Sequence, residues 1–181
     1  MFAIIGQKIN DRLKGNADFV NANGKTLGSE LISNNTWDNT TGWLTNPSSG
    51  LPYALSVLNN NLKIQTAGFN TTAKTYTLIS VQQGKSYFCE YSYNSSYQTS
   101  VDIGTTIYGS EVYEGVHNAT GTGTTSFTFT ATTTGTYYVS FINNSSVSSS
   151  FGFLTAISLK EVTSAKVFPV IIPQGTTYPA T

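Results

Sequence analysis

Residues 85–93 (KSYFCEYSY) decide the fold class, because their side chains alternate along the whole segment. Tyr87, Cys89, Tyr91 and Tyr93 fall on one face, and serine, phenylalanine and glutamate fall on the other. A period of two residues is typical of a β-strand with one face in a core and the other toward solvent. Cysteine is among the most buried residue types. We therefore predict a strand here whose face around Cys89 packs inside the protein.

The same alternation continues on both sides of this segment. Turn-forming residues separate the alternating runs, and no run has the period of a 10–15-residue helix. In residues 152–162 the alternation places Phe153, Ile157 and Leu159 on one face. The sequence predicts an all-β protein, a jelly-roll β-sandwich, with these further strands: 30–33, 53–58, 62–67, 75–81, 101–108, 124–131, 136–142 and 152–162.

Composition divides the chain into an N-terminal arm (1–28), the sandwich (29–163) and an extended C-terminal tail (164–181). Pro169 and Pro173 favour an extended or edge conformation in the tail. Exposed apolar side chains at both ends would form an aggregation-prone patch, so these segments either fold back on their own sandwich or bind a neighbouring subunit, and we favour the second. The residues predicted to bind a partner are Phe2, Ile4 and Ile5 in the arm, and Val167, Phe168, Val170, Ile171 and Ile172 in the tail.

The charge content excludes several classes of function. Charged residues make up 10% of the 181 residues, the formal net charge is zero and Arg12 is the only arginine, whereas a nucleic-acid-binding protein needs clustered Lys and Arg. His117 and Cys89 are the only residues of their types, so one chain forms neither an internal disulfide nor a Cys/His zinc site. The N-terminus lacks a basic, apolar secretory signal, and no apolar run reaches about 20 residues, so we expect a protein without membrane contact.

Several short motifs in residues 29–163 together resemble the carbohydrate-binding-module type of galactose-binding-like jelly roll. That pattern combines a Gly-Trp pair, a glycine-lysine-tyrosine strand start, a "tG.y.v.f" strand and a final "vsl.e" strand. The segments that carry the resemblance are 30–33, 41–43, 81–87, 101–104, 126–131, 135–139 and 157–162.

The resemblance implies several properties. Modules of this type often bind glycans on aromatic platforms, often hold a structural calcium ion, and recur in virion proteins of tailed bacteriophages. The aspartate common in the last strand would fall near Thr155 and Ala156, and neither residue is acidic. Calcium usually needs several carboxylates, so we predict no metal site and no cofactor.

Four aromatic residues are candidates for glycan binding, since a sugar ring stacks on an exposed aromatic ring: Trp37, Tyr53, Tyr93 and Tyr97. The alternative for each is burial, because large aromatic side chains mostly bury their area. Trp43 belongs to the Gly-Trp motif, for which we expect a core position.

Glu111, Glu114 and His117 lie in residues 109–125, which we predict to be the longest loop of the sandwich. A carboxylate pair held about 5–10 Å apart would be needed for glycoside hydrolysis. A glycine-rich loop holds catalytic groups poorly, so we interpret these side chains as solvated loop charges and predict no catalytic residue.

The leading hypothesis from the sequence is a non-enzymatic virion structural protein, a capsid decoration (cement) protein assembled in the host cytoplasm. The arm and tail would attach it to the major capsid protein or another virion protein, as a homo-oligomer with a trimer favoured. The alternative is a glycan-binding module of a phage tail fibre or adhesin that recognises host polysaccharide. A glycoside hydrolase is the third and least supported class.

Overall fold

The structure is a computed structural model that describes residues 19–20, 26–45, 54–67, 71–118, 120–145, 147 and 149–163. Every regular element in these residues is a β-strand, and every strand pair is antiparallel. The all-β sandwich predicted from the sequence is confirmed. The strands are β1 (Phe19–Val20), β2 (Thr26–Glu30), β3 (Ala54–Leu58), β4 (Asn61–Gln65), β5 (Thr71–Val81), β6 (Ser86–Ser95), β7 (Thr99–Gly104), β8 (Tyr113–His117), β9 (Gly121–Thr130), β10 (Gly135–Ser145) and β11 (Phe151–Thr163).

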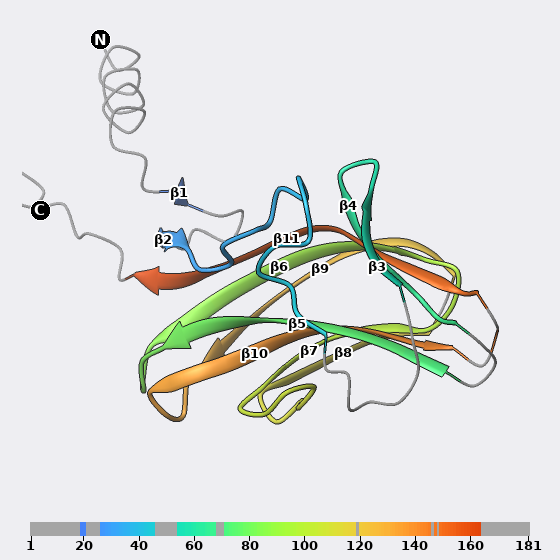
Figure 1. Cartoon of the computed structure of the whole chain (residues 1–181). Coiled ribbons are helices and arrows are strands. Elements are labelled where there is room, and N and C mark those ends of the chain that lie inside the picture. Colours follow the sequence, from blue (N-terminus) through green and yellow to red (C-terminus); the bar gives the residue numbers. More distant parts are fainter. Residues whose placement is uncertain are drawn as a thin grey trace, which may run out of the picture.

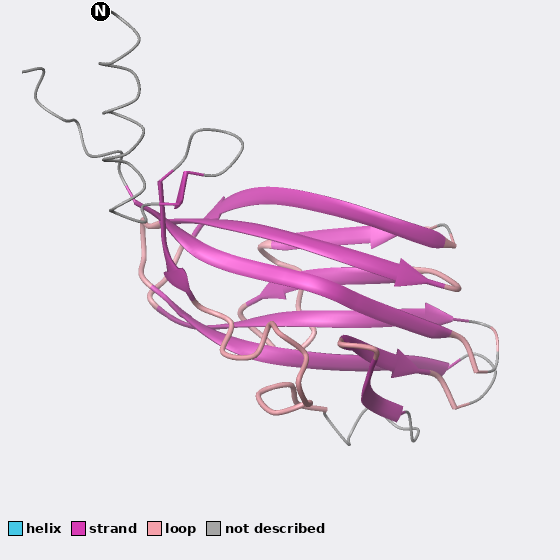
Figure 2. Ribbon diagram, turned by 90° about the horizontal axis from the view of Figure 1, so that it is seen from above, coloured by secondary structure: helices cyan, strands magenta, loops and turns pink. Residues whose placement is uncertain are grey.

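Two sheets form the layers of the sandwich (Figure 1). Sheet A runs β9-β6-β11, and the far edge of the long β11 is shared by β4 and β3 along its first part and by β2 and β1 along its last part. Sheet B has the order β5-β10-β7-β8. The strands of both layers run along one common direction (Figure 2), as in sandwiches whose sheets pack nearly aligned.

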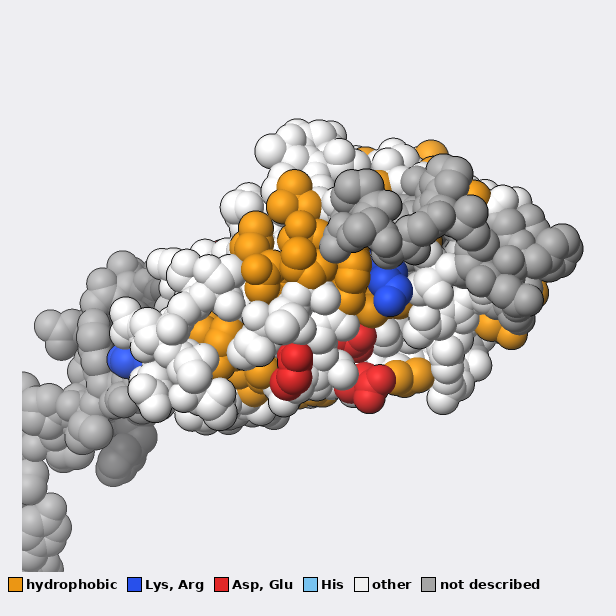
Figure 3. Space-filling view, turned by 60° about the horizontal axis from the view of Figure 1, so that its bottom comes forward, with side chains coloured by type: hydrophobic (Ala, Val, Ile, Leu, Met, Phe, Trp, Pro, Cys, Tyr) orange, Lys and Arg blue, Asp and Glu red, His pale blue; other side chains and the backbone are white. Residues whose placement is uncertain are grey.

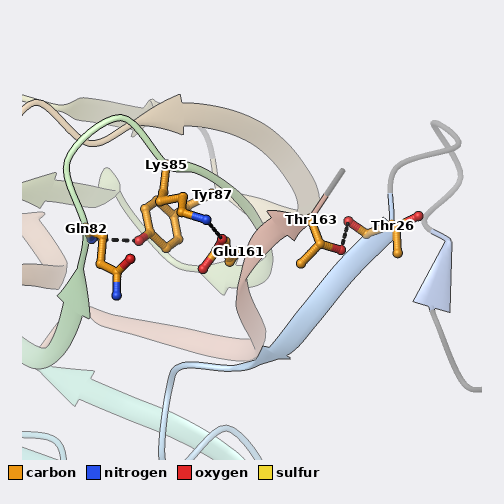
Figure 4. Close-up of polar contacts among 6 residues, drawn as sticks. All are labelled: Thr26, Gln82, Lys85, Tyr87, Glu161 and Thr163. Atoms are coloured by element: carbon orange, nitrogen blue, oxygen red, sulfur yellow. Dashed lines mark hydrogen bonds and ion pairs between the residues drawn. The ribbon is translucent and has the colours of Figure 1, made fainter. Parts of the chain in front are cut away.

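The core lies between the sheets and is filled by the inward face of each strand. Cys89 is fully buried, and the hydroxyl of Tyr87 accepts a hydrogen bond of 2.8 Å from the backbone amide of Gln82 (Figure 4). This bond satisfies the one polar atom of a buried tyrosine ring. The buried side chains on the inward faces include Leu62, Ile64, Ile79, Val81, Tyr91, Val101, Ile103, Tyr137, Val139, Phe141, Leu154, Ile157 and Leu159.

Polar contacts hold the end of β11 (Figure 4). Lys85 Nζ lies 3.0 Å from a carboxylate oxygen of Glu161, and Thr163 Oγ1 donates a hydrogen bond of 3.3 Å to the carbonyl of Thr26. The second bond joins β11 to β2, which begins at Thr26. Strand β2 of sheet A therefore crosses position 28, where composition placed the boundary between the arm and the sandwich.

Three expectations about the strands are corrected. The strand expected at 30–33 is β2, which spans 26–30 and follows the two-residue β1. The expected loop 109–125 contains the whole of β8 and the start of β9. In β11 a β-bulge between Leu154 and Ala156 reverses the alternation, so Leu154 and Ile157 both face the core while Phe153 faces outward.

Candidate functional site

The outward face of sheet B carries a row of four side chains that crosses all its strands. Strand pairing places Tyr76 of β5 opposite Ser140 of β10, Ser140 opposite Asp102 of β7, and Asp102 opposite Glu114 of β8. Neighbouring strands lie about 4.8 Å apart, so this row extends over roughly 14 Å. An aromatic ring, a hydroxyl and two carboxylates therefore lie side by side on one face.

Three tyrosines form an aromatic cluster at the β5 end of this row. The ring centroid of Tyr76 lies 5.6 Å from that of Tyr108, edge to face, and 5.8 Å from that of Tyr138. Lys74, two residues before Tyr76 on the same face, places its Nζ 5.2 Å from the centre of the Tyr108 ring. All three rings are half-buried, so each has part of its surface available to a ligand.

The loop between β7 and β8 (residues 105–112) supplies Tyr108 and folds back over this face. The hydroxyl of Tyr108 donates a hydrogen bond of 3.3 Å to the carbonyl of Lys74 on β5, two strands away from β7. The backbone of Gly109 lies against Gly104 so closely that a Cβ on Gly104 would be 2.5 Å from it. Tyr108 has φ +63°, a conformation unusual for a bulky residue, and the surrounding contacts hold it there.

Glu111 closes the base of the same loop. Its carboxylate accepts hydrogen bonds from the Thr105 amide at 3.2 Å and from the Thr106 hydroxyl at 3.0 Å. Hydrogen bonds from its own backbone amide and from Thr106 hold the pKa of Glu111 below its ordinary value. Glu111 is therefore a fixed negative charge at the border of the face.

Asp102 and Ser140 point outward from the sheet, yet they are only 5% and 0% exposed. Asp102 Oδ2 accepts a hydrogen bond of 3.2 Å from Ser100. Within the described residues neither Asp102 Oδ1 nor the Ser140 hydroxyl has a hydrogen-bond partner. Burial, and then the charge of Glu114, raise the pKa of Asp102 to about 6, despite hydrogen bonds from Ser100 and the backbone of Gly115.

Figure 3 shows this face of the molecule, with hydrophobic side chains gathered on it and acidic side chains along one border. Exposed apolar residues extend the tyrosine cluster in several directions: Leu78 on β5 is 43% exposed, Leu44, which bridges Tyr76, is 43% exposed, and Val116 on β8 is 41% exposed. An aromatic and aliphatic surface with a few fixed polar groups is the usual composition of a small-molecule or sugar site.

The indoles occupy the core, not this face. Trp37 is 2% exposed, and its Nε1 donates a hydrogen bond of 3.2 Å to the carbonyl of Thr155. Its ring packs 5.5 Å from that of Trp43, which is 4% exposed. An indole enclosed in this way presents no free ring to a sugar, so the exposed platform considered for Trp37 is corrected to a core position. Tyr53 lies outside the described residues.

Tyr93 and Tyr97 lie away from the row. Tyr93 is on the inward face of β6 and stacks on His117 with ring centroids 3.9 Å apart. Tyr97 is half-buried and lines a pocket of about 300 Å³ with Gln98, Asn118 and Thr120. Tyr93 therefore belongs to the packing between the sheets, whereas Tyr97 borders a pocket.

Glu114 and His117 lie on opposite faces of β8. Glu114 faces outward, whereas His117 Nε2 lies 2.7 Å from the hydroxyl of Tyr91 between the sheets. Burial lowers the pKa of His117, which favours the neutral ring in this contact. The two side chains do not converge on one reacting atom, and both belong to a strand instead of the solvated loop that the sequence predicted.

The residues present do not fit the calcium ion that the family resemblance implies. In the part of the chain that the structure describes, no group of three or more His, Cys, Asp or Glu residues is placed to hold a metal. Glu30, the acid that lies against β11, accepts hydrogen bonds from the Leu159 amide (2.8 Å), the Ser158 hydroxyl (2.6 Å) and two amides of its own turn. Its oxygens face donor hydrogens, which do not coordinate a cation.

The partner-binding candidates in the arm (Phe2, Ile4, Ile5) and in the tail (Val167, Phe168, Val170, Ile171, Ile172) all lie outside the described residues. Their proposed role therefore stays a prediction. Among the residues that are described, no helix has the length and apolar character needed to cross a membrane.

Sequence reasoning missed the outward row and its tyrosine cluster. The alternation in β5 does place Tyr76 and Leu78 together on one face. It does not show that Ser140 and Asp102 lie beside them, because strand neighbours in sheet B come from distant parts of the chain. Pairing the tyrosine-bearing faces of residues 75–81 and 136–142 is the signal that could have located the site.

Comparison of the whole fold identifies similar solved structures. No protein-family model and no curated protein sequence matches this chain. A family 4 carbohydrate-binding module has a TM-score of 0.53 at 17% identity, covering 74% of this chain and 95% of that one. A family 61 carbohydrate-binding module in complex with β-1,4-galactotriose has a TM-score of 0.50 at 11% identity, covering 73% of this chain and 98% of that one.

The enzymatically active domain of tailspike protein 4 from bacteriophage CBA120 has a TM-score of 0.58 at 10% identity. The match covers 74% of this chain but only 21% of the tailspike chain. At these identities the comparisons show a shared fold, the jelly roll of carbohydrate-binding modules. They give no support to a role in capsid decoration.

Proposed function

We propose that this chain is a non-catalytic glycan-binding module and that it binds sugar on the outward face of sheet B. The observation that carries the proposal is the row from Tyr76 through Ser140 to Asp102, with Tyr108 and Tyr138 beside it. Aromatic rings receive the apolar face of a pyranose, and fixed polar groups at the border orient its hydroxyls.

The comparisons support this proposal at the level of fold. Two of the similar structures are carbohydrate-binding modules, and one of these holds a galactose trisaccharide. The similarity to a phage tailspike domain agrees with the alternative hypothesis from the sequence. In that hypothesis the chain is part of a phage tail fibre or adhesin and binds a polysaccharide of the host. The proposal therefore follows that alternative in place of capsid decoration.

Calorimetric titration with a panel of neutral oligosaccharides tests the proposal. Tyr76→Ala and Tyr138→Ala should each weaken binding about 5- to 30-fold, because each removes a stacking surface of roughly 1–2 kcal/mol. Phe153→Ala is the matched control, since Phe153 belongs to an aromatic pair with Phe151 on the outward face of sheet A, where Lys63 lies nearby.

Weaker binding in the two tyrosine variants and unchanged binding in Phe153→Ala would support the site. Unchanged binding in the two tyrosine variants and weaker binding in Phe153→Ala would instead indicate a site on the outward face of sheet A. Wild-type protein that binds no member of the panel would contradict the function itself.

A further inference from the structure

The outward face of sheet B carries more negative than positive side chains. Among the described residues, three carboxylates lie on or beside this face, from Asp102, Glu111 and Glu114, whereas Lys74 is its only lysine or arginine. The Lys74 ammonium lies over the Tyr108 ring at 5.2 Å. Figure 3 shows the acidic side chains beside the hydrophobic surface.

Two of these carboxylates are adjacent in the row that crosses the sheet. Asp102 and Glu114 are paired across β7 and β8, a like-charge pair that ordinarily destabilises a sheet. Asp102 is 5% exposed, its Oδ1 lacks a partner, and the neighbouring Ser140 hydroxyl is also buried without one in the described part of the chain. The electric field of a buried carboxylate passes through the low-dielectric protein more than through water. Dissolved salt therefore screens the charge of Asp102 only weakly.

The acids do not serve a metal instead. No group of three or more metal-ligating side chains is arranged to hold an ion within the residues that the structure describes. Glu111 is already occupied by the Thr105 amide and the Thr106 hydroxyl. The unbalanced negative charge therefore acts on whatever lies on the aromatic surface.

We propose that this face selects uncharged glycans over uronate-containing glycans, and that Asp102 and Glu114 set this preference by repelling an anionic sugar. The proposal rests on the glycan-binding function proposed above and specifies its substrate class. Tyr138 lies one strand from β7 and diagonally next to Asp102, so a sugar on Tyr138 lies about 7 Å from the carboxylate. Asp102 at that distance, together with Glu114 one strand farther away on β8, disfavours a uronate by about 3- to 30-fold.

Competing titrations test the selectivity. The probes are neutral cello-, xylo-, manno- and galacto-hexasaccharides and the uronate hexasaccharide of polygalacturonic acid, near neutral pH at low salt. The variants are Glu114→Gln and Asp102→Asn, which keep side-chain shape. Glu90→Gln is the matched control, because Glu90 is an exposed carboxylate on the outward face of sheet A and its loss changes net charge equally.

The expected result is that wild-type protein binds a neutral hexasaccharide at least about 3-fold more tightly than the uronate. Each of the two variants should raise the relative affinity for the uronate by about 2- to 10-fold, while Glu90→Gln leaves it unchanged. Raising salt to about 0.5 M should reduce the wild-type preference through screening at exposed Glu114. Thermal melts of the three variants show that each is folded.

Uronate binding as tight as neutral binding, or an equal shift in Glu90→Gln, would overturn the selectivity while leaving the glycan-binding function intact. Absence of binding to every hexasaccharide would overturn both.

Discussion

Asp102 is a residue whose charged side chain lowers the stability of the fold. Its carboxylate is almost fully buried, with one oxygen hydrogen-bonded to Ser100 and the other without a partner among the described residues. Burial opposes the charged form, so the pKa rises to about 6 from an ordinary value of 3.8. Such a group destabilises the folded state near neutral pH, which is common where a side chain is retained for binding.

Replacing Asp102 by Asn should therefore stabilise the protein in a pH-dependent way. Because the folded-state pKa is raised, the stability associated with neutral Asp102 is fully present below about pH 3.8 and is lost as pH rises through about 6. Asp102→Asn should have a free energy of unfolding similar to wild type near pH 4 and about 1–3 kcal/mol higher near pH 8. Urea unfolding at the two pH values measures this, and an equal difference at both would contradict it.

Glu30 is the residue whose carboxylate joins the first long strand of sheet A to the last. It accepts four hydrogen bonds, from the Leu31, Ile32 and Leu159 amides and from the Ser158 hydroxyl. Glu30→Ala would leave these donors unsatisfied in a part-buried region and should lower the free energy of unfolding by about 2–4 kcal/mol. Exposed Glu90→Ala is the control and should change it by less than about 0.5 kcal/mol. Equal effects of the two substitutions in chemical denaturation would show that the network contributes little.

The loop 105–112 is the element that shapes the candidate site. It leaves β7 at Gly104, places Tyr108 over β5 and returns to β8. Gly104 makes this path possible because the loop backbone occupies the space where a side chain would lie. The position of the Tyr108 ring on the outward face of sheet B thus depends on the absence of a Cβ at Gly104 of β7.

Gly104→Ala should displace the loop. Its Cβ would be 2.5 Å from the backbone of Gly109 and would also meet the Glu111 carboxylate, so we expect a loss of about 1–3 kcal/mol in unfolding free energy. Gly28→Ala on β2 is the matched control, because its Cβ would meet nothing closer than 3.6 Å and should cost under about 0.5 kcal/mol. Thermal and urea unfolding compare the two, and a tolerated Gly104→Ala would contradict the close approach.

At the scale of the whole molecule, the sandwich depends on its core and on its antiparallel pairing. Sheet A and sheet B enclose a continuous layer of aromatic and aliphatic side chains. Among the described acids, Glu30 is hydrogen-bonded within sheet A, whereas Asp102 and Glu114 lie side by side on the outward face of sheet B.

Calcium should leave the thermal stability unchanged. A site that binds calcium only in the folded state would raise the melting temperature as the ion concentration rises. Differential scanning calorimetry with excess calcium and with a chelator should give the same transition for this protein. A melting temperature that increases with calcium would contradict the absence of a fitting donor set among the described residues.

The sequence predicts most of the secondary structure because alternation is a local property. Residues 85–93 and 124–131 correspond to β6 and β9, and in β6 the expected face around Cys89 points inward, since side chains in a strand point to opposite sides in turn. For β11, the prediction that Phe153 shares a face with Ile157 and Leu159 was wrong, because a bulge after Leu154 adds one residue and exchanges the two faces. A bulge depends on the partner strand and leaves no periodic signal in the chain.

The candidate site could be predicted only in fragments. The alternation grouped Tyr76 with Leu78, and the family resemblance implied an aromatic platform. The resemblance, however, directed attention to Trp37, whose ring the fold places in the core. A large aromatic side chain suits both burial and sugar stacking, so residue type alone does not separate the two.

By itself the sequence determined that this protein is a neutral, low-charge β-sandwich, because alternation, turn residues and composition act through neighbours along the chain. Only the tertiary structure decided that Tyr76, Ser140, Asp102 and Glu114 form one row and that Tyr108 lies over its end. Those residues come from four strands and a loop, and pairing register brings them together through hydrogen bonds between distant segments. The register of long-range pairs arises from packing of the whole core, which no single segment specifies.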